Sequence, residues 1–180
     1  MAAKVRQLPF FSNLGDGDTE GPFSQKEYSD IVFTLPGGRA GLTTEGGFVI
    51  KSTNKTGATS VKGTLTLAST TTNNACGLTS ADTTHPIGVM YEDGIADGAE
   101  CWVVISGRCQ VKLENNVAAT RGYWARTSVT AAGRADATNA NPPGGGVVEL
   151  DAHMCEIGHC LESVSASASG ALCYIMLHFN

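Results

Sequence analysis

Two histidines and two cysteines lie within residues 153–160, which read HMCEIGHC. Thiolates and imidazoles are the side chains that zinc prefers, and a structural zinc site is usually completed by a second closely spaced pair of them. No second pair lies near Cys155 and Cys160 in the sequence. His159 and Cys160 are also neighbours, and neighbours on a strand face opposite sides of a sheet. We therefore expect no metal here, and interpret the cysteines as small buried apolar side chains.

An acidic segment at residues 16–27, DGDTEGPFSQKE, has the spacing of a calcium-binding loop. The ligand positions hold four carboxylates: Asp16, Asp18, Glu20 and Glu27. However, Pro9 disfavours a helix before the segment, and the YSDIVFTL that follows is typical of a strand. An acidic, glycine-rich linker explains the same residues, so the sequence leaves calcium binding open.

The composition predicts a mainly β protein. The chain has 180 residues, of which 22 are glycine and only 16% are charged, and it is rich in Thr, Ser and Val. The net charge of −5, with no basic stripe, argues against a nucleic-acid partner. We find no secretory signal and no apolar run of membrane-spanning length, and so expect assembly in a cytoplasm and six unpaired thiols.

Turn signals and alternating patterns place the elements. Strands are predicted in DIVFTL (30–35), in GGFVIKST (46–53) and in CWVVISGRCQVKLE (101–114), with a bulge or turn at Ser106-Gly107. The final CYIMLHF (173–179) is nearly all apolar and predicts a buried strand. Residues 1–30 show no sustained period, so we interpret them as an extended N-terminal arm and residues 31–180 as the β domain.

An internal repeat runs through the β domain. IGVMYED (87–93) matches IGHCLES (157–163), and GAECWVVI (98–105) matches GALCYIML (170–177). KGTLTLAS (62–69) matches RGYWARTS (121–128), and GLTSADTT matches GRADAT. The two units span about 61–107 and 120–178. The repeat puts Cys160 where Met90 stands and His159 where Val89 stands. It also makes Gly88 and Gly158 equivalent, each at a point that needs close backbone approach or a positive φ.

The repeat also bears on catalysis. Four carboxylates bracket the loop at 92–100: Glu92, Asp93, Asp97 and Glu100. The second unit keeps only Glu162 of these, so we interpret the carboxylates as solvated turn residues. His85 has no nucleophile motif around it. With no catalytic set in the sequence, we expect a protein that is not an enzyme and binds no cofactor.

Laid out as two units, the chain resembles the head decoration proteins of tailed phages, also called capsid cement. The resemblance lies in HPIGVMYEDGIADGAECWVVISGRCQVKLE, in RGYWARTSVTAAGRADAT and in the closing IGHCLESVSASASGALCYIMLHF, and covers about residues 61–180. It implies a small β-barrel or β-tulip-like fold and homotrimers on the outer capsid surface of the virion. Such trimers bind the major capsid protein of the expanded icosahedral head and stabilise it without catalysis and without nucleic acid or membrane.

The arm supplies the candidate capsid contacts, because its apolar side chains have no period that would bury them in their own domain. These are Leu8, Pro9, Phe10, Phe11 and Leu14. An alternative reading is a receptor- or glycan-binding β module of a phage fibre or spike, which needs an exposed aromatic platform. Trp102 lies in an apolar run and is predicted to be core, so Trp124 is the candidate for such a platform. A third class, a calcium-dependent hydrolase, depends on the Asp16 loop.

Overall fold

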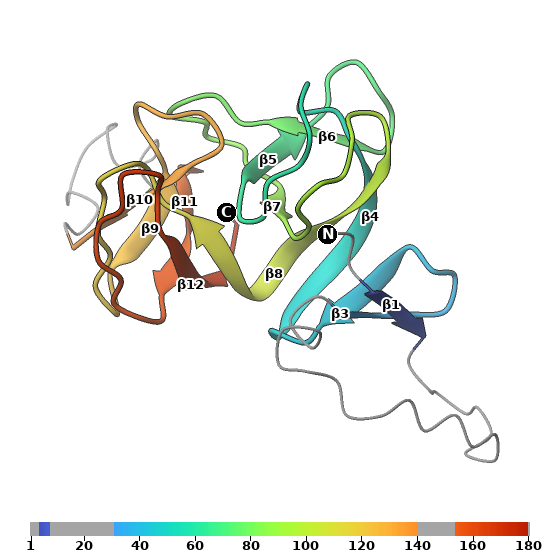
Figure 1. The fold of residues 1–180 in the computed structure, drawn as a ribbon, viewed down its shortest axis with the longest axis horizontal. Helices are drawn as coiled ribbons and strands as arrows, with labels where there is room; N and C mark the ends of the chain where they lie inside the picture. Colours follow the sequence, from blue (N-terminus) through green and yellow to red (C-terminus); the bar gives the residue numbers. More distant parts are fainter. Residues whose placement is uncertain (1–3, 8–30, 140–153, 180) are drawn as a thin grey trace, which may run out of the picture.

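In a computed structural model of the chain, residues 4–7, 31–139 and 154–179 are described. This part is mainly β, as the composition predicts, and its strands join into one 12-stranded sheet (Figure 1). The strands are β1 (Lys4–Gln7), β2 (Ile31–Thr34), β3 (Ala40–Thr43), β4 (Gly47–Asn54), β5 (Leu65–Ala68), β6 (Ala75–Leu78), β7 (Gly88–Met90), β8 (Glu100–Lys112), β9 (Trp124–Thr127), β10 (Ala135–Thr138), β11 (Glu156–Cys160) and β12 (Leu172–Leu177).

Strands β2, β4, β8 and β12 lie where the sequence predicts them. β12 differs from its prediction in burial: Cys173, Ile175 and Leu177 face the core, whereas Met176 is 44% exposed. A run of apolar residues does not show which face of a strand is exposed to solvent. In β12 the face that carries Leu172 and Met176 is exposed although it is apolar. β3 was not predicted, because its Ala-Gly-Leu-Thr has weak strand propensity and is held by hairpin pairing with β2 and β4.

The described part of the predicted arm is strand β1. It pairs in parallel with β2, with Lys4 opposite Ile31 and Gln7 opposite Thr34, at one edge of the sheet. This backbone pairing places residues 4–7 with the β domain. The other residues of the predicted arm, 1–3 and 8–30, lie outside the described residues.

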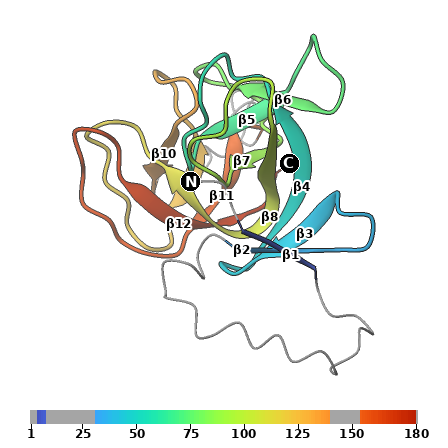
Figure 2. The same cartoon turned by 45° about the vertical axis from the view of Figure 1, so that its right-hand side comes forward.

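Five strands of the first half pair in a closed circuit. β4 pairs with β6, β6 with β5, β5 with β7, β7 with β8, and β8 returns to β4. All of these pairings are antiparallel except that of β4 with β6. Figures 1 and 2 show these strands gathered on one side of the molecule, with β9 to β12 on the other.

The second half repeats this order of pairings. β8 pairs with β12, β12 with β11, β11 with β9, and β9 with β10, all antiparallel. A parallel bridge between Leu113, just after β8, and Ala135 of β10 completes the circuit. It corresponds to the parallel pair Asn54–Cys76 in the first half.

The register is also the same in both halves. Val89 lies opposite Leu65 where β7 meets β5, and Met90 lies opposite Val103 where β7 meets β8. The matched pairs are His159–Trp124 and Cys160–Ile175. Because one residue of slip would exchange the two faces of a strand, matching registers put matched side chains on matched faces.

Strand β8 is long because it belongs to both circuits. Residues 100–107 pair with β4, whereas residues 107–112 pair with β12. At the junction the register against β4 shifts, so that Ile105 is an extra residue, and Gly107 has a φ of 84°. The bulge predicted at Ser106-Gly107 is therefore confirmed to within a residue, and it marks the boundary between the two circuits (Figure 1).

The two circuits share a core. One buried cluster runs from Val32 through Val104 to Leu177 and includes Trp102, which is 2% exposed, as predicted. A smaller cluster inside the first half consists of Cys76, Met90, Cys101 and Val103. Among the described residues there is no helix with the length and apolarity that crossing a membrane requires.

Gly88 and Gly158 both lie where another backbone approaches closely, as expected. A Cβ at Gly88 would lie 2.6 Å from the carbonyl oxygen of Val104. A Cβ at Gly158 would overlap the carbonyl oxygen of Met176, which the repeat matches to Val104. Gly158 also has a φ of 144°, a conformation that L-residues rarely adopt.

Candidate functional site

The predicted capsid-contact residues Leu8, Pro9, Phe10, Phe11 and Leu14 lie outside the described residues. The same holds for Asp16, Asp18, Glu20 and Glu27 of the calcium-type loop. The capsid contacts therefore stay a prediction, and calcium binding stays open.

All six cysteines are unpaired thiols and all are buried, as predicted. Two of them form a thiol pair inside the first circuit, where Cys76 Sγ lies 3.7 Å from Cys101 Sγ. The hydrogen bond from the Cys101 thiol lowers the pKa of Cys76 to about 7, and the same bond, with burial, raises the pKa of Cys101. Cys160 and Cys173 form a second thiol pair, in the second circuit, with the pKa lowered at Cys160 and raised at Cys173 by their mutual hydrogen bond. Only Cys173 has a thiol counterpart in the first circuit, Cys101, because Cys160 matches Met90.

Cys109 gives a test of this burial through alkaline pH. Burial, followed by the negative charge of Glu45, raises the pKa of the Cys109 thiol far above its ordinary value. When the pH passes about 8.5, the thiol ionises in the unfolded chain but not in the folded one, so stability falls as the pH rises. We expect the unfolding free energy to fall with pH between about 9 and 10.5 more steeply in the wild type than in Cys109→Ala, by up to about 1.4 kcal/mol per pH unit.

Urea unfolding at a series of pH values measures this difference. Lysines and tyrosines titrate in both proteins, so their contribution cancels in the comparison. Parallel curves for the two proteins would show that the Cys109 thiol ionises in the folded state as readily as in the unfolded one.

The carboxylates of the loop at 92–100 do not converge on one another. Asp97 accepts a hydrogen bond from the Gly57 N–H at 3.0 Å, and Glu100 pairs with Lys51 at 2.8 Å. Glu92 was wrongly interpreted as a solvated turn residue: it is 5% exposed, and its Oε2 accepts the Trp102 N–H at 2.8 Å. Glu162 does the same in the second unit, accepting the Tyr174 N–H at 2.9 Å. These two glutamates have a structural role: Glu92 connects the loop after β7 to β8, and Glu162 connects the loop after β11 to β12.

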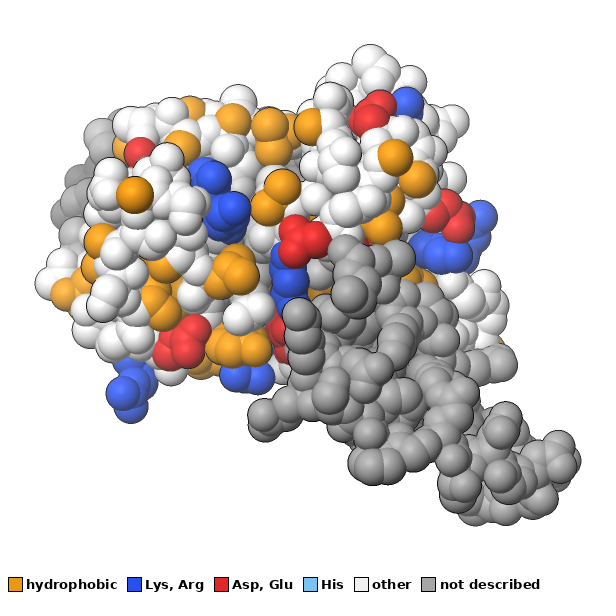
Figure 3. All heavy atoms as spheres, viewed as in Figure 1, with side chains coloured by type: hydrophobic (Ala, Val, Ile, Leu, Met, Phe, Trp, Pro, Cys, Tyr) orange, Lys and Arg blue, Asp and Glu red, His pale blue; other side chains and the backbone are white. Residues whose placement is uncertain are grey.

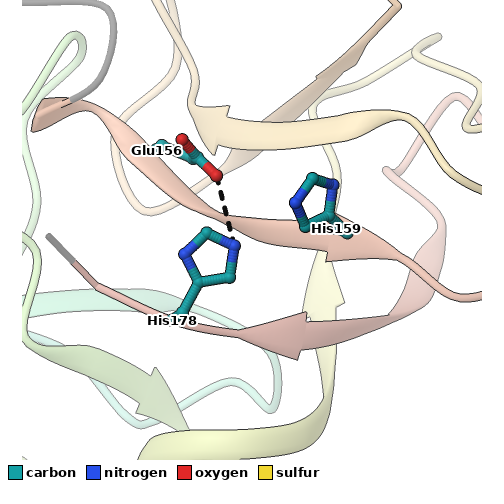
Figure 4. A group of neighbouring side chains, drawn as sticks. All are labelled: Glu156, His159 and His178. Carbon is teal, nitrogen blue, oxygen red and sulfur yellow. Dashed lines mark ion pairs between the residues drawn. The ribbon is translucent and has the colours of Figure 1, made fainter.

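The structure brings together a set of metal-ligand side chains that the sequence argument did not assemble. One ligand atom each from Glu156, His159 and His178 lies within 4.8 Å of the others. His178 Nε2 and Glu156 Oε1 are 3.2 Å apart, and the rings of His159 and His178 have centroids 5.2 Å apart. Figure 4 shows the carboxylate directed toward His178 with the His159 ring beside them.

A bulge in β11 makes this arrangement possible. Residues three apart on a regular strand face opposite sides of a sheet. Here Glu156 lies opposite Arg126 but Gly158 lies opposite Ala125, so Ile157 is an extra residue on β11. The extra residue brings Glu156 back to the face that carries His159. His178 follows β12, and its N–H donates to the Ile157 carbonyl at 3.0 Å, which places it across from the bulge.

The surroundings of the cluster differ from side to side. The Glu156 side chain is 5% exposed, whereas that of His178 is 42% exposed, so the cluster is open at one side. The Trp124 ring lies against His159, with centroids 4.3 Å apart and the planes tilted by 46°. Trp124 is half-buried by this contact, so it presents only part of its ring as a platform.

The ligand-type side chains that come together in HMCEIGHC are not the cysteines on which the sequence analysis focused. His159 and Cys160 do face opposite sides, and both cysteines of the stretch lie in the interior, Cys155 beside Asp82. The ligand-type residues that meet are Glu156 and His159 of the stretch and a third residue, His178, which directly follows the neighbouring strand β12. Strand pairing, which the repeat already implied, is the signal that connects residue 178 to residue 157.

A scan against models of known protein families and a search of curated proteins each found no match to this chain.

Proposed function

We propose that this protein is a phage capsid decoration protein, which binds the outer surface of the expanded icosahedral head as a homotrimer and stabilises it without catalysis. The proposal rests on the residues of the resemblance, and these residues build the matched parts of the sheet. HPIGVMYEDG leads through β7 into the Glu92 loop, and IGHCLES leads through β11 into the Glu162 loop. The major capsid protein is the proposed partner.

The observation that carries the proposal is the shared pairing and register of the two circuits. It supports two further points: that each circuit is a small β-barrel-like unit, and that the two are copies of one unit. On this account the copies begin one strand earlier than the sequence repeat, at β4 and at the second half of β8. The two units share strand β8 and a common core, so together they form one body with two similar surfaces. Such a body suits a protein that stabilises the capsid lattice by binding several capsid subunits.

Exposed apolar side chains supply contact surface for such a role. The large ones that are well exposed among the described residues are Leu42, Val61, Leu78, Val129, Met154, Leu161, Leu172 and Met176. Figure 3 shows hydrophobic side chains reaching the surface at several separate places on one face. Leu172 and Met176 stand on the outward face of β12. Contacts repeated three times in a trimer add through effective concentration, so that each one can be weak.

Sedimentation with purified phage heads tests the proposal. The protein is mixed with expanded heads and, separately, with unexpanded heads, and the pelleted fraction is measured. We expect saturable binding to expanded heads of a decorated phage and at least about tenfold weaker binding to unexpanded ones. Equal recovery in the pellet with and without heads would contradict the proposal.

The predicted contact residues give a sharper expectation. Phe10→Ala/Phe11→Ala leaves the β1 residues unchanged and removes two side chains, each able to bury about 150–250 Å². We expect the double variant to keep the wild-type melting temperature and to bind expanded heads at least about tenfold more weakly. Asn115→Ala, at an exposed polar site outside the apolar contact surface, serves as the control. Unchanged affinity in the double variant would show that residues 8–14 are not the anchor.

A further inference from the structure

The positions of Glu156, His159 and His178 can be compared with their matches in the first circuit. By the repeat these matches are Pro86, Val89 and Ser106, none of which has a side chain that commonly binds a metal in proteins. Val89 is fully buried. The second circuit thus carries a ligand-type side chain at three positions where the first does not, and all three meet within 4.8 Å. The first circuit has buried apolar side chains at two of these positions, Pro86 and Val89, and an exposed serine at the third.

The distances suit a single ion. Two ligands on one tetrahedral zinc ion, each about 2.0–2.2 Å from the metal, lie roughly 3.3–3.6 Å apart. The separation of His178 Nε2 and Glu156 Oε1, at 3.2 Å, is already close to this range. The His159 nitrogen lies within 4.8 Å of both, a gap that a rotation of a half-buried imidazole can close.

We propose that Glu156, His159 and His178 bind a divalent transition-metal ion, zinc in the first place. Two imidazoles with one carboxylate favour zinc and its neighbours in the transition series over magnesium or calcium, which prefer oxygen ligands alone. The exposed side of His178 leaves room for water at a remaining coordination position. The ion links β11 to the end of β12, so it stabilises the pairing of these two neighbouring strands. This proposal does not depend on capsid binding.

Calorimetric titration of the full, metal-free chain with zinc chloride tests the site. We expect one zinc ion per chain, at least about tenfold weaker binding in His178→Ala and in His159→Asn, and unchanged binding in His85→Ala, which removes an exposed histidine far from the cluster in the sequence. Zinc should also raise the melting temperature of the wild type but not of His178→Ala. Trp124 fluorescence should change on binding, because its ring lies against His159.

Cobalt(II) separates this site from the six thiols. Binding at the proposed ligands gives a visible d–d spectrum without the near-ultraviolet thiolate band. The proposal is overturned if zinc does not bind the wild type, if His178→Ala binds it unchanged, or if the cobalt spectrum shows thiolate ligands. Glu156 and His178 would then form an ion pair only. His178 is partly exposed, so its variant is expected to fold even if a change at buried Glu156 prevents folding.

Discussion

Gly158→Ala is expected to destabilise the protein by about 3–5 kcal/mol, a large part of the roughly 5–15 kcal/mol by which a typical domain is stable. Two costs add together. The φ of 144° is one that alanine rarely adopts, and the new Cβ would overlap the Met176 carbonyl oxygen on the paired strand. A backbone oxygen in a sheet cannot move aside without breaking the pairing of β11 with β12.

Gly122→Ala is the matched control. Gly122 also has a positive φ, of 85°, but no other atom lies within 4 Å of a Cβ placed there. This variant should lose only about 1 kcal/mol, the cost of the backbone conformation. Urea unfolding of both variants measures the difference. Equal losses would mean that the β12 backbone does not approach Gly158 closely enough to exclude a Cβ there.

Lys62→Met is expected to cost about 3–5 kcal/mol, because it leaves a buried carboxylate without its counter-ion. Lys62 Nζ lies 2.7 Å from Glu45 Oε1, and the two side chains are 12% and 4% exposed. The ammonium also lies 4.9 Å from the centre of the Tyr91 ring. The pair connects the β3–β4 turn to the segment before β5.

The double variant Glu45→Gln/Lys62→Met separates the pair from its parts. Because it removes both charges, it should recover at least half of the loss seen in Lys62→Met. Urea unfolding of the wild type, both single variants and the double variant gives the coupling energy. If the two single losses simply add in the double variant, the ion pair does not contribute in the way that its burial indicates.

The sequence predicted best those strands that local patterns define. Strands β2, β4 and β8 and the kink at Gly107 follow from alternation and turn residues. The shared register was also within reach, since the matches of Met90 with Cys160 and of Cys101 with Cys173 agree with the observed pairing.

Other parts of the repeat were out of reach. The match of GLTSADTT with GRADAT is shifted by three residues, because the register places Asp136, not Gly133, at the position of Gly77. Both β4 and β8 were predicted as strands, but the equivalence of β4 with the second half of β8 was missed, since GFVIKSTN and its counterpart share almost no residues. Backbone hydrogen bonds define these strands, and their side chains differ.

The candidate metal site needed geometry that a sequence pattern does not contain. Strict alternation puts Glu156 and His159 on opposite faces, and only the extra residue Ile157 brings them together. His178 joins them through the pairing of β11 with β12 across a connection that spans residues 161–171. The two cysteines that made the stretch conspicuous have interior positions instead.

Electron microscopy of expanded heads, imaged with and without added protein, tests the proposed decoration function most directly. The account predicts extra density on the outer surface at the local three-fold positions, with room for three chains at each. Classes of heads with partial occupancy should show the same positions filled. Heads that look the same with and without a saturating amount of the protein, or density confined to fibres or spikes, would contradict it.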